Sequence, residues 1–279
     1  MKATEQAVND VPVVIRGTTR IFPVVGFPVH QVKAPKLYND YFMRKGLDCA
    51  VVPIEIAPED YATVLPALLR AKNVGGVMVT IPHKVPTAEL LDVRSVAVTV
   101  TGSCNAIKRL PDGRLTGDMF DGKGFVRAAE ATGFVPRGSR CLVVGAGGAG
   151  AAIAAALAEA GAAAVRMFDL RTQHTEELAA MMQPHFPDCT IEAGPNCLDG
   201  FDLVVNATPL GMDPADPPVV DFSRITPQMT VGEIVMKVEV TPLVAAARAK
   251  GCRVVLGYEM LKAQQSLYLE FLGLPGPND

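Results

Sequence analysis

The chain has 279 residues, of which 49% are hydrophobic and 20% charged, so it can fill one large core or two smaller ones, and disorder is not expected. Its 26 Lys and Arg against 29 Asp and Glu give a formal net charge of -3, which favours neither nucleic acid nor an anionic membrane surface as a partner. The longest apolar stretch, 149–160, contains Glu159 and is shorter than the roughly 20 residues of a membrane span. The first twelve residues carry Glu5 and Asp10 and lack the apolar region of a secretory signal. We therefore expect a cytoplasmic protein that acts on a small molecule.

Cysteine and histidine spacing indicates neither disulfides nor a metal site. The six cysteines form no Cys-x-x-Cys pair, and Cys49 and Cys141 lie in apolar runs, which favours buried thiols over disulfides. The four histidines have no metal-ligand spacing with one another or with the cysteines, so we expect no metal site.

The first half of the chain alternates strand and helix patterns. Strands are predicted at 21–25, 49–56 and 76–81, and helices at 35–45 and 58–72. The segments 103–108 and 114–116 flank a turn beginning at Leu110 and predict a hairpin. The alternation predicts parallel crossovers in at least part of this region.

The second half begins with an apolar strand, a glycine loop and an Ala-rich helix that ends at Ala160. Further strands are predicted at 163–168, 203–206, 230–235 and 253–256, and helices at 241–250 and 258–272. We place a domain junction near 121–125 and a second crossing near Gly257. The predicted fold is α/β with two domains, residues 1–120 with 258–279 and residues 121–257.

The glycine loop has the context of a dinucleotide-binding site. Gly145, Gly147 and Gly150 form a Gly-x-Gly-x-x-Gly pattern between the strand 140–144 and the helix. The first glycine allows a tight turn, the second allows a pyrophosphate to approach, and the third allows close packing of helix and strand. The pyrophosphate then lies at the helix N-terminus. The alternative is an Ala/Gly-rich helix packed on a sheet without a ligand.

Two residues after the next strand bear on the choice of cofactor. Asp169 can accept hydrogen bonds from the adenosine ribose, and its charge repels a 2′-phosphate, which favours NAD. Arg171 can cover a 2′-phosphate and leaves NADP open. The alternative for Asp169 is a cap of the following helix or turn.

Polar residues at strand ends in the first half are candidates for proton transfer. Thr80 and Lys84 bracket the end of a strand, Asn105 begins another, and Asp118 and Asp121 lie at the domain junction. A Lys and an Asp that face one secondary alcohol form a workable acid/base pair. Taken singly, Lys84 is better interpreted as a solvated surface charge and Asp121 as a helix N-cap.

Eight sequence blocks in order resemble the shikimate/quinate dehydrogenase family, over about residues 22–272. The blocks are Gly26-x-Pro28, Val79-Thr-x-Pro-x-Lys84, Gly102-x-x-Asn105, Asp121-Gly-x-Gly124, Gly145-Ala-Gly-Gly-Ala-Gly150, Asn206-Ala-Thr-Pro-Leu-Gly-Met212, Thr241-Pro-Leu243 and Gly257-x-x-Met260-Leu-x-x-Gln264.

The resemblance implies an N-terminal substrate domain, a C-terminal Rossmann domain and a cleft between them. It implies Lys84 and Asp121 as the catalytic pair, with Thr80, Asn105 and Gln264 contacting substrate hydroxyls. The expected cofactor contacts are Gly145, Gly147, Gly148, Ala149, Gly150, Asp169, Arg171, Thr208 and Met260.

The substrate pocket departs from the family. The usual Ser-x-Ser-Pro, whose hydroxyls hold a carboxylate, reads Val32-Lys-Ala-Pro here. A carboxylate that loses such donors loses about 1.5–3 kcal/mol for each. Apolar residues also replace polar residues usual in the family: Met78, Ala106, Met119, Phe120 and Met236. Asp118 is an added polar residue that can bond a substrate hydroxyl.

The combination predicts retained redox chemistry on an altered substrate. We expect an NAD(P)-dependent dehydrogenase that oxidises a ring secondary alcohol of a shikimate/quinate-like or cyclitol substrate, as a monomer or homodimer. One alternative is an ordinary shikimate dehydrogenase of aromatic amino-acid biosynthesis. Another is a module that senses a dinucleotide and a metabolite without turnover, for which the pair Lys84 and Asp121 has no use.

Overall fold

The computed structural model describes residues 14–213 and 215–276, and two six-stranded sheets organise the chain. The first sheet has the order β2-β1-β3-β5-β6-β4. Its strands are β1 (Arg20–Gly26), β2 (Cys49–Glu55), β3 (Val77–Val79), β4 (Val93–Arg94), β5 (Ala106–Arg109) and β6 (Leu115–Asp118). The strands β2, β1 and β3 are parallel, whereas β5 runs antiparallel to both β3 and β6.

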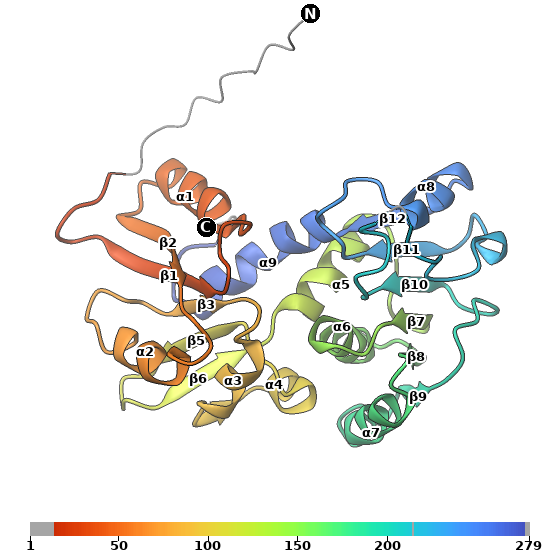
Figure 1. Cartoon of the computed structure of the whole chain (residues 1–279), viewed down its shortest axis with the longest axis horizontal. Coiled ribbons are helices and arrows are strands. Elements are labelled where there is room, and N and C mark those ends of the chain that lie inside the picture. The colour runs from red at the N-terminus through yellow and green to blue at the C-terminus, as the bar shows by residue number, and fades with distance from the viewer. Residues whose placement is uncertain (1–13, 214, 277–279) are drawn as a thin grey trace, which may run out of the picture.

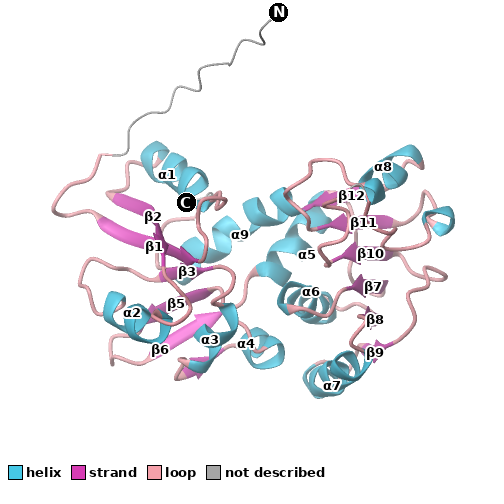
Figure 2. Ribbon diagram, viewed as in Figure 1, coloured by secondary structure: helices cyan, strands magenta, loops and turns pink. Residues whose placement is uncertain are grey.

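Helices cover both faces of this sheet (Figure 2). The helices are α1 (Ala34–Arg44), α2 (Tyr61–Leu68), α3 (Lys84–Glu89) and α4 (Val96–Thr101), and α9 (Gly257–Phe271) returns from the end of the chain. Because side chains alternate along a strand, Phe22 and Val24 join one core with α1 and α9. Val25 joins the other core with α2 and α4.

The second sheet is wholly parallel, with the order β12-β11-β10-β7-β8-β9. Its strands are β7 (Arg140–Val144), β8 (Ala164–Phe168), β9 (Thr190–Ala193), β10 (Leu203–Asn206), β11 (Thr230–Glu233) and β12 (Arg253–Leu256). Chain order runs outward in both directions from β7, so the strands β7 and β10 flank the switch point at which ligands bind in such sheets.

The two sheets form the two halves of the molecule in Figure 1, and α5 and α9 run between them. The remaining helices are α5 (Asp121–Ala131), α6 (Gly148–Glu159), α7 (Thr172–Met182), α8 (Pro242–Ala249) and the 3-10 turns Gln183–His185 and Phe222–Arg224. Gly122 lets α5 approach α6, because a Cβ there would collide with the carbonyl of Ala152. Gly124 likewise lets α5 approach the side chain of Gln264 on α9.

Most predicted elements are confirmed, and the differences have local causes. The helix predicted at 58–72 spans only Tyr61–Leu68, because residues before Tyr61 form turns in which Asp60 N–H donates to the Ala57 carbonyl. The short or polar elements α3, β4, α7 and β9 were not predicted. The helix α4 was not predicted either, because its sequence, VAVTVT, consists mainly of β-branched residues. Ser95 caps its start and Gly102 ends it in the left-handed conformation, which overrides the low helix propensity.

The expectations about thiols and metal can be compared with the described residues. All six cysteines lie among them and are free thiols. Within residues 14–213 and 215–276, no group of three or more His, Cys, Asp and Glu is arranged to hold a metal ion. No helix in those ranges is long and apolar enough to cross a membrane. The N-terminal segment judged above not to be a signal, 1–12, lies outside the described residues.

Candidate active site

Lys84 and Asp121 meet where the first sheet ends. Lys84 is the first residue of α3, just beyond β3, and Asp121 is the first residue of α5, just beyond β6. The Lys84 ammonium lies 2.6 Å from Asp121 Oδ2, and the two side chains are 21% and 7% exposed. Phe120 occupies the cap position of α5, so the carboxylate of Asp121 serves side chains of other elements and is not the helix cap.

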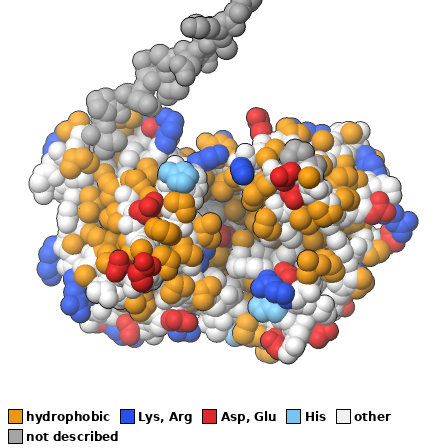
Figure 3. Space-filling model, in the orientation of Figure 1, with side chains coloured by type: hydrophobic (Ala, Val, Ile, Leu, Met, Phe, Trp, Pro, Cys, Tyr) orange, Lys and Arg blue, Asp and Glu red, His pale blue; other side chains and the backbone are white. Residues whose placement is uncertain are grey.

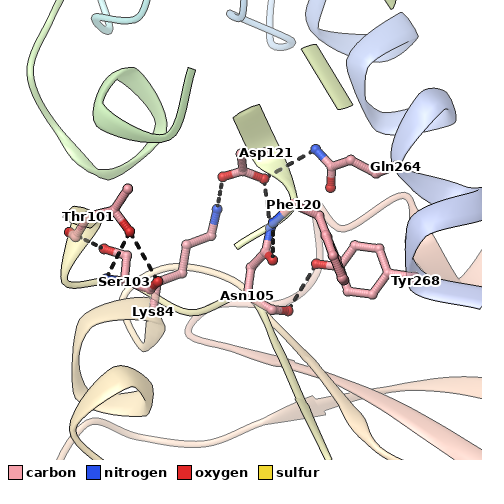
Figure 4. Close-up of polar contacts among 8 residues, drawn as sticks. All are labelled: Lys84, Thr101, Ser103, Asn105, Phe120, Asp121, Gln264 and Tyr268. Atoms are coloured by element: carbon pink, nitrogen blue, oxygen red, sulfur yellow. Dashed lines mark hydrogen bonds and ion pairs between the residues drawn. The ribbon is translucent and has the colours of Figure 1, made fainter. Parts of the chain in front are cut away.

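Three side chains donate hydrogen bonds to the Asp121 carboxylate (Figure 4). Besides Lys84, Asn105 Nδ2 donates to Asp121 Oδ1 at 2.9 Å, and Gln264 Nε2 donates to the same oxygen at 3.2 Å. Asn105 directly precedes β5, and Gln264 lies on α9. The carboxylate is therefore fixed in place, and it fixes the ammonium, whose other N–H groups remain available as donors.

Asn105 is itself held in one orientation. Its Oδ1 accepts a hydrogen bond from the backbone N–H of Phe120 at 2.9 Å, and its backbone carbonyl accepts one from the Tyr268 hydroxyl at 2.9 Å. Tyr268 lies on the same helix as Gln264 and is buried. Sequence reasoning did not identify Tyr268, because only the packing of α9 against β5 brings its hydroxyl to Asn105.

The glycine loop between β7 and α6 has the shape needed for a phosphate. Gly145 has φ +104, which favours glycine, and a Cβ on Gly150 would collide with the Gly145 carbonyl oxygen. Gly147 is the N-cap of α6 and makes no side-chain cap bond, and a Cβ built there meets nothing within 4 Å. The N–H groups of the first helical turn, at Gly148 and Ala149, have no partner within the helix and can bind a pyrophosphate.

Asp169 and Arg171 form an ion pair beside this loop. Arg171 Nε lies 3.0 Å from Asp169 Oδ1, and Arg171 Nη2 lies 3.1 Å from Oδ2. Asp169 also accepts hydrogen bonds from the backbone N–H groups of Arg171 and Ala146, at 3.0 and 2.8 Å. The hydrogen bonds from the Arg171 side chain, followed by these backbone bonds, hold the pKa of Asp169 well below its usual range. Asp169 thus links the glycine loop to the end of β8. It also accepts a hydrogen bond within the turn after β8, as the alternative interpretation of Asp169 predicted.

The buried carboxylate of Glu233 organises the loop after β10, on the other side of β7 from Asp169. Glu233, at the end of β11, accepts hydrogen bonds from Asn206 Nδ2 at 3.0 Å and from the Thr241 hydroxyl at 2.8 Å. Asn206 Oδ1 accepts from both the backbone N–H and the hydroxyl of Thr208. Burial raises the pKa of Glu233. The sequence analysis missed Glu233, although a lone acid inside the apolar run 230–235 was a usable signal.

Comparisons with known proteins identify the family. Residues 24–107 match the model of the shikimate dehydrogenase substrate-binding domain, and residues 134–210 match a model of a putative NAD(P)-binding domain. A shikimate dehydrogenase (NADP+) of Geobacter metallireducens is 39% identical over 258 residues, 90% of each chain. The chain belongs to the shikimate dehydrogenase family. It is an NAD(P)-dependent oxidoreductase acting on CH–OH groups.

Solved structures of this family share the whole fold. The shikimate 5-dehydrogenase of Listeria monocytogenes, in complex with shikimate and NAD, has a TM-score of 0.87 and 25% identity, over 96% of this chain and 97% of that chain. The 5-ketofructose reductase of a Gluconobacter species has a TM-score of 0.83 and 26% identity, over 91% of this chain and 92% of that chain. The expected two-domain α/β fold with a Rossmann-type half is therefore confirmed.

The segment 32–34, at which the sequence departs from the family's Ser-x-Ser pattern, has apolar side chains at both serine positions. Val32 and Ala34 are half-buried and pack against the core under α1 and α9. Lys33 is exposed, and its ammonium lies 5.5 Å from the centre of the Tyr258 ring. Met236, which replaces the family's tyrosine, lies against Gly257 at the start of α9.

Other predicted site residues make contacts of their own, away from Lys84 and Asp121, among the described hydrogen bonds. Thr80 follows β3 directly, and its backbone N–H donates to the Val25 carbonyl. Asp118 accepts hydrogen bonds from Ser95 Oγ at 2.6 Å and from the Met119 N–H at 2.8 Å, so its carboxylate faces α4. Met260 is buried on α9, one turn before Gln264.

Proposed function

We propose that the chain reversibly oxidises a ring secondary alcohol of a shikimate/quinate-like or cyclitol substrate to the ketone, with Lys84 and Asp121 as its catalytic pair. The observation that carries the proposal is the 2.6 Å contact between Lys84 and Asp121. Its environment supports the role, because Asn105 and Gln264 hold the carboxylate from two different elements.

The protein's part in this reaction is placement and proton transfer. The bound nicotinamide cofactor exchanges the hydride. In the direction of ketone reduction, the Lys84 ammonium donates a hydrogen bond and then a proton to the carbonyl oxygen, and in oxidation the neutral amine takes that proton from the alcohol. Asp121 orients Lys84 through their 2.6 Å contact. Such positioned proton transfer is worth about 10²–10⁴ in rate.

The substrate would lie between Lys84 and Asp121 on one side and an apolar wall formed by Val32 and Ala34 on the other. Thr80, Asn105 and Gln264 would contact its hydroxyls. Asp118 is the least favoured of the proposed contacts, because its carboxylate already bonds Ser95 and Met119.

The cofactor would occupy the glycine loop. Gly145, Gly147, Gly148, Ala149 and Gly150 would hold the pyrophosphate. Thr208 and Met260 would lie along the nicotinamide half, and Asp169 with Arg171 at the adenosine ribose. Asp169 favours NAD, whereas a 2′-phosphate would have to draw Arg171 away from it. We assign the substrate to residues 1–120 with 258–279 and the cofactor to residues 121–257. The cytoplasmic location and the monomeric or homodimeric state stay predictions.

An ordinary shikimate dehydrogenase remains the second candidate, favoured by the relatives named shikimate dehydrogenase (NADP+). The absence of hydroxyls at Val32 and Ala34 argues against efficient use of shikimate. The likeness to a 5-ketofructose reductase supports a sugar-like substrate. The sensing alternative is disfavoured because the chain is an oxidoreductase by family.

The decisive experiment measures reduction of NAD and of NADP with shikimate, quinate and a panel of carboxylate-free cyclic polyols. Turnover with any of these alcohols that is lost in Lys84→Ala supports the proposal. Efficient turnover of shikimate alone, with NADP, supports the second candidate. Cofactor binding without turnover of any alcohol contradicts both.

A further inference from the structure

The helix α9 carries three buried side chains on one face. Met260, Gln264 and Tyr268 are spaced four residues apart, so they share that face. The helix runs between the two halves of the molecule in Figure 1, and the surface is hollowed between those halves in the same view in Figure 3. Gln264 donates directly to Asp121. Tyr268 lies one turn further along, and its hydroxyl bonds Asn105, the other residue whose side-chain amide holds Asp121.

The Tyr268 hydroxyl is a permanent donor to the Asn105 backbone. It donates to the Asn105 carbonyl at 2.9 Å, and the same carbonyl accepts the N–H of Val79 at 2.7 Å. Tyr268 is 6% exposed, and burial raises the pKa of its hydroxyl well above the usual value, so the phenol keeps its proton. Because a carbonyl oxygen has two lone pairs, these two bonds satisfy it. Asn105 is thereby joined both to β3, which leads to Lys84, and to α9.

The ring of Tyr268 supports the residue before Asp121. It packs edge-on against the ring of Phe120, with centroids 5.0 Å apart and an interplanar angle of 73°. The backbone N–H of Phe120 donates to Asn105 Oδ1 at 2.9 Å, so Tyr268, Phe120 and Asn105 form a closed set of contacts (Figure 4). Phe120 is the cap of α5, and Asp121 is the first residue of that helix. Tyr268 therefore braces the start of the helix that presents the Asp121 carboxylate.

A second buried tyrosine shows what is particular to Tyr268. Tyr41 lies on α1, is 4% exposed, and donates its hydroxyl to the Pro275 carbonyl at 2.7 Å. The two tyrosines make the same kind of hydrogen bond and differ in which carbonyl they hold. Only the carbonyl held by Tyr268 belongs to a residue whose side chain bonds Asp121. Hydrogen bonds weaken as their distances and angles depart from the preferred range, so a shift of the Asn105 backbone would weaken that bond.

We propose that Tyr268 is a positioning residue for the reaction: its hydroxyl holds Asn105 in the place from which the Asn105 amide orients the Asp121 carboxylate. This inference rests on the proposed function, in which Lys84 and Asp121 are the catalytic pair. It extends the network that supports this pair from the ends of β3 and β6 into α9.

The test is Tyr268→Phe, which removes only the hydroxyl and keeps the ring packed on Phe120. With the alcohol of the panel that the unmodified enzyme oxidises best, we expect kcat to fall about 3- to 10-fold, with the Kd of the cofactor unchanged. Tyr41→Phe is the matched control. Both variants should lose a similar amount of melting temperature, because each loses one buried hydrogen bond to a carbonyl, but Tyr41→Phe should keep the kcat of the unmodified enzyme.

A double-mutant cycle with Asn105→Ala tests whether the effect passes through the Asn105 side chain. If the Tyr268 hydroxyl acts by placing that amide, Tyr268→Phe should lower kcat in the unmodified enzyme and leave it unchanged in Asn105→Ala. The two substitutions are then not additive, because the amide that Tyr268 would position is already absent.

Two results overturn the inference. One is an unchanged kcat in Tyr268→Phe, whatever its melting temperature, which makes the hydroxyl a structural feature only. The other is an equal fold-loss of kcat from Tyr268→Phe with and without the Asn105 side chain, which means that the hydroxyl acts independently of that side chain.

If the unmodified enzyme turns over no alcohol, the proposed function fails, and nuclear magnetic resonance decides the role of Tyr268 separately. The proton and nitrogen shifts of the Asn105 side-chain amide, assigned by their loss in Asn105→Ala, report its hydrogen bond to Asp121. A change of these shifts in Tyr268→Phe but not in Tyr41→Phe supports the positioning of Asn105 by Tyr268. Any other pattern contradicts it.

Discussion

The two walls of the candidate site differ in how completely their polar atoms are satisfied. On the catalytic side, both oxygens of Asp121 and both ends of the Asn105 side chain have partners. On the side where we propose that Val32 and Ala34 face the substrate, neither side chain offers a polar atom. A fully hydrogen-bonded network keeps one geometry in the absence of substrate, whereas apolar side chains do not orient the polar groups of a ligand. The difference supports the proposal that the reaction of the family is retained on an altered substrate.

The largest expected effect comes from removing Lys84, which belongs to the hydrogen-bonded network around Asp121. Lys84→Ala should lower kcat about 10²- to 10⁴-fold, because it removes the proton-transfer group while leaving the glycine loop intact. The Kd of the cofactor should change little, which fluorescence titration with reduced cofactor would measure. Lys72→Ala, at an exposed lysine of the same half, is the control. A large loss of cofactor affinity in Lys84→Ala would count against the role of Lys84.

Serine substitutions can restore the family's two hydroxyls at Val32 and Ala34. Val32→Ser with Ala34→Ser should raise kcat/KM for shikimate about 10-fold or more, because each restored hydroxyl can donate to a carboxylate with about 1.5–3 kcal/mol. The activity toward carboxylate-free polyols should fall or stay level. Steady-state kinetics of both substrate classes check this, and an unchanged rate with shikimate would remove the loop from the substrate site.

On the cofactor side, Asp169 is an intermediate case, because its partner Arg171 is a group that the 2′-phosphate of NADP would draw away. Asp169→Ala should shift the preference toward NADP by about 10-fold, because it removes the repulsion of a 2′-phosphate and releases Arg171 to bind it. Asp169→Asn separates the charge from the hydrogen bonds. Equal Kd ratios for NAD and NADP in all three proteins would show that Asp169 does not contact the ribose.

The smallest expected effect concerns the buried Glu233. Its pKa is raised above the ordinary value of 4.5, so the folded chain keeps this proton to a higher pH than the unfolded chain does. The free energy of unfolding therefore falls as pH rises from 4.5 through the raised pKa. In Glu233→Gln that fall should be absent. Urea unfolding of both proteins at several pH values measures it, and identical pH dependences would exclude the ionisation of Glu233 as a contributor.

Local patterns in the sequence were enough for the elements that repeat a simple period. The apolar runs of β7, β10 and β12 were predicted with their observed bounds, and the loop with Gly145 and Gly150 was predicted with its strand and helix. β10 is buried over its whole length and β7 is buried after Arg140, so their apolar composition reveals them. The sequence motifs also led to the family and to Lys84 and Asp121 as a pair.

Tertiary contacts decided what those patterns left open. The segment VAVTVT became the helix α4 because its two ends are fixed by Ser95 and Gly102 and one face is buried. Gln264 reaches Asp121 across 143 positions of the chain, and Tyr268 reaches Asn105 across 163. The sequence by itself determined the family, the parallel cofactor sheet and the chemical types available to the site. Only the fold decided which hydroxyls, amides and carboxylates meet, because hydrogen bonding and desolvation depend on neighbours that are remote in the chain.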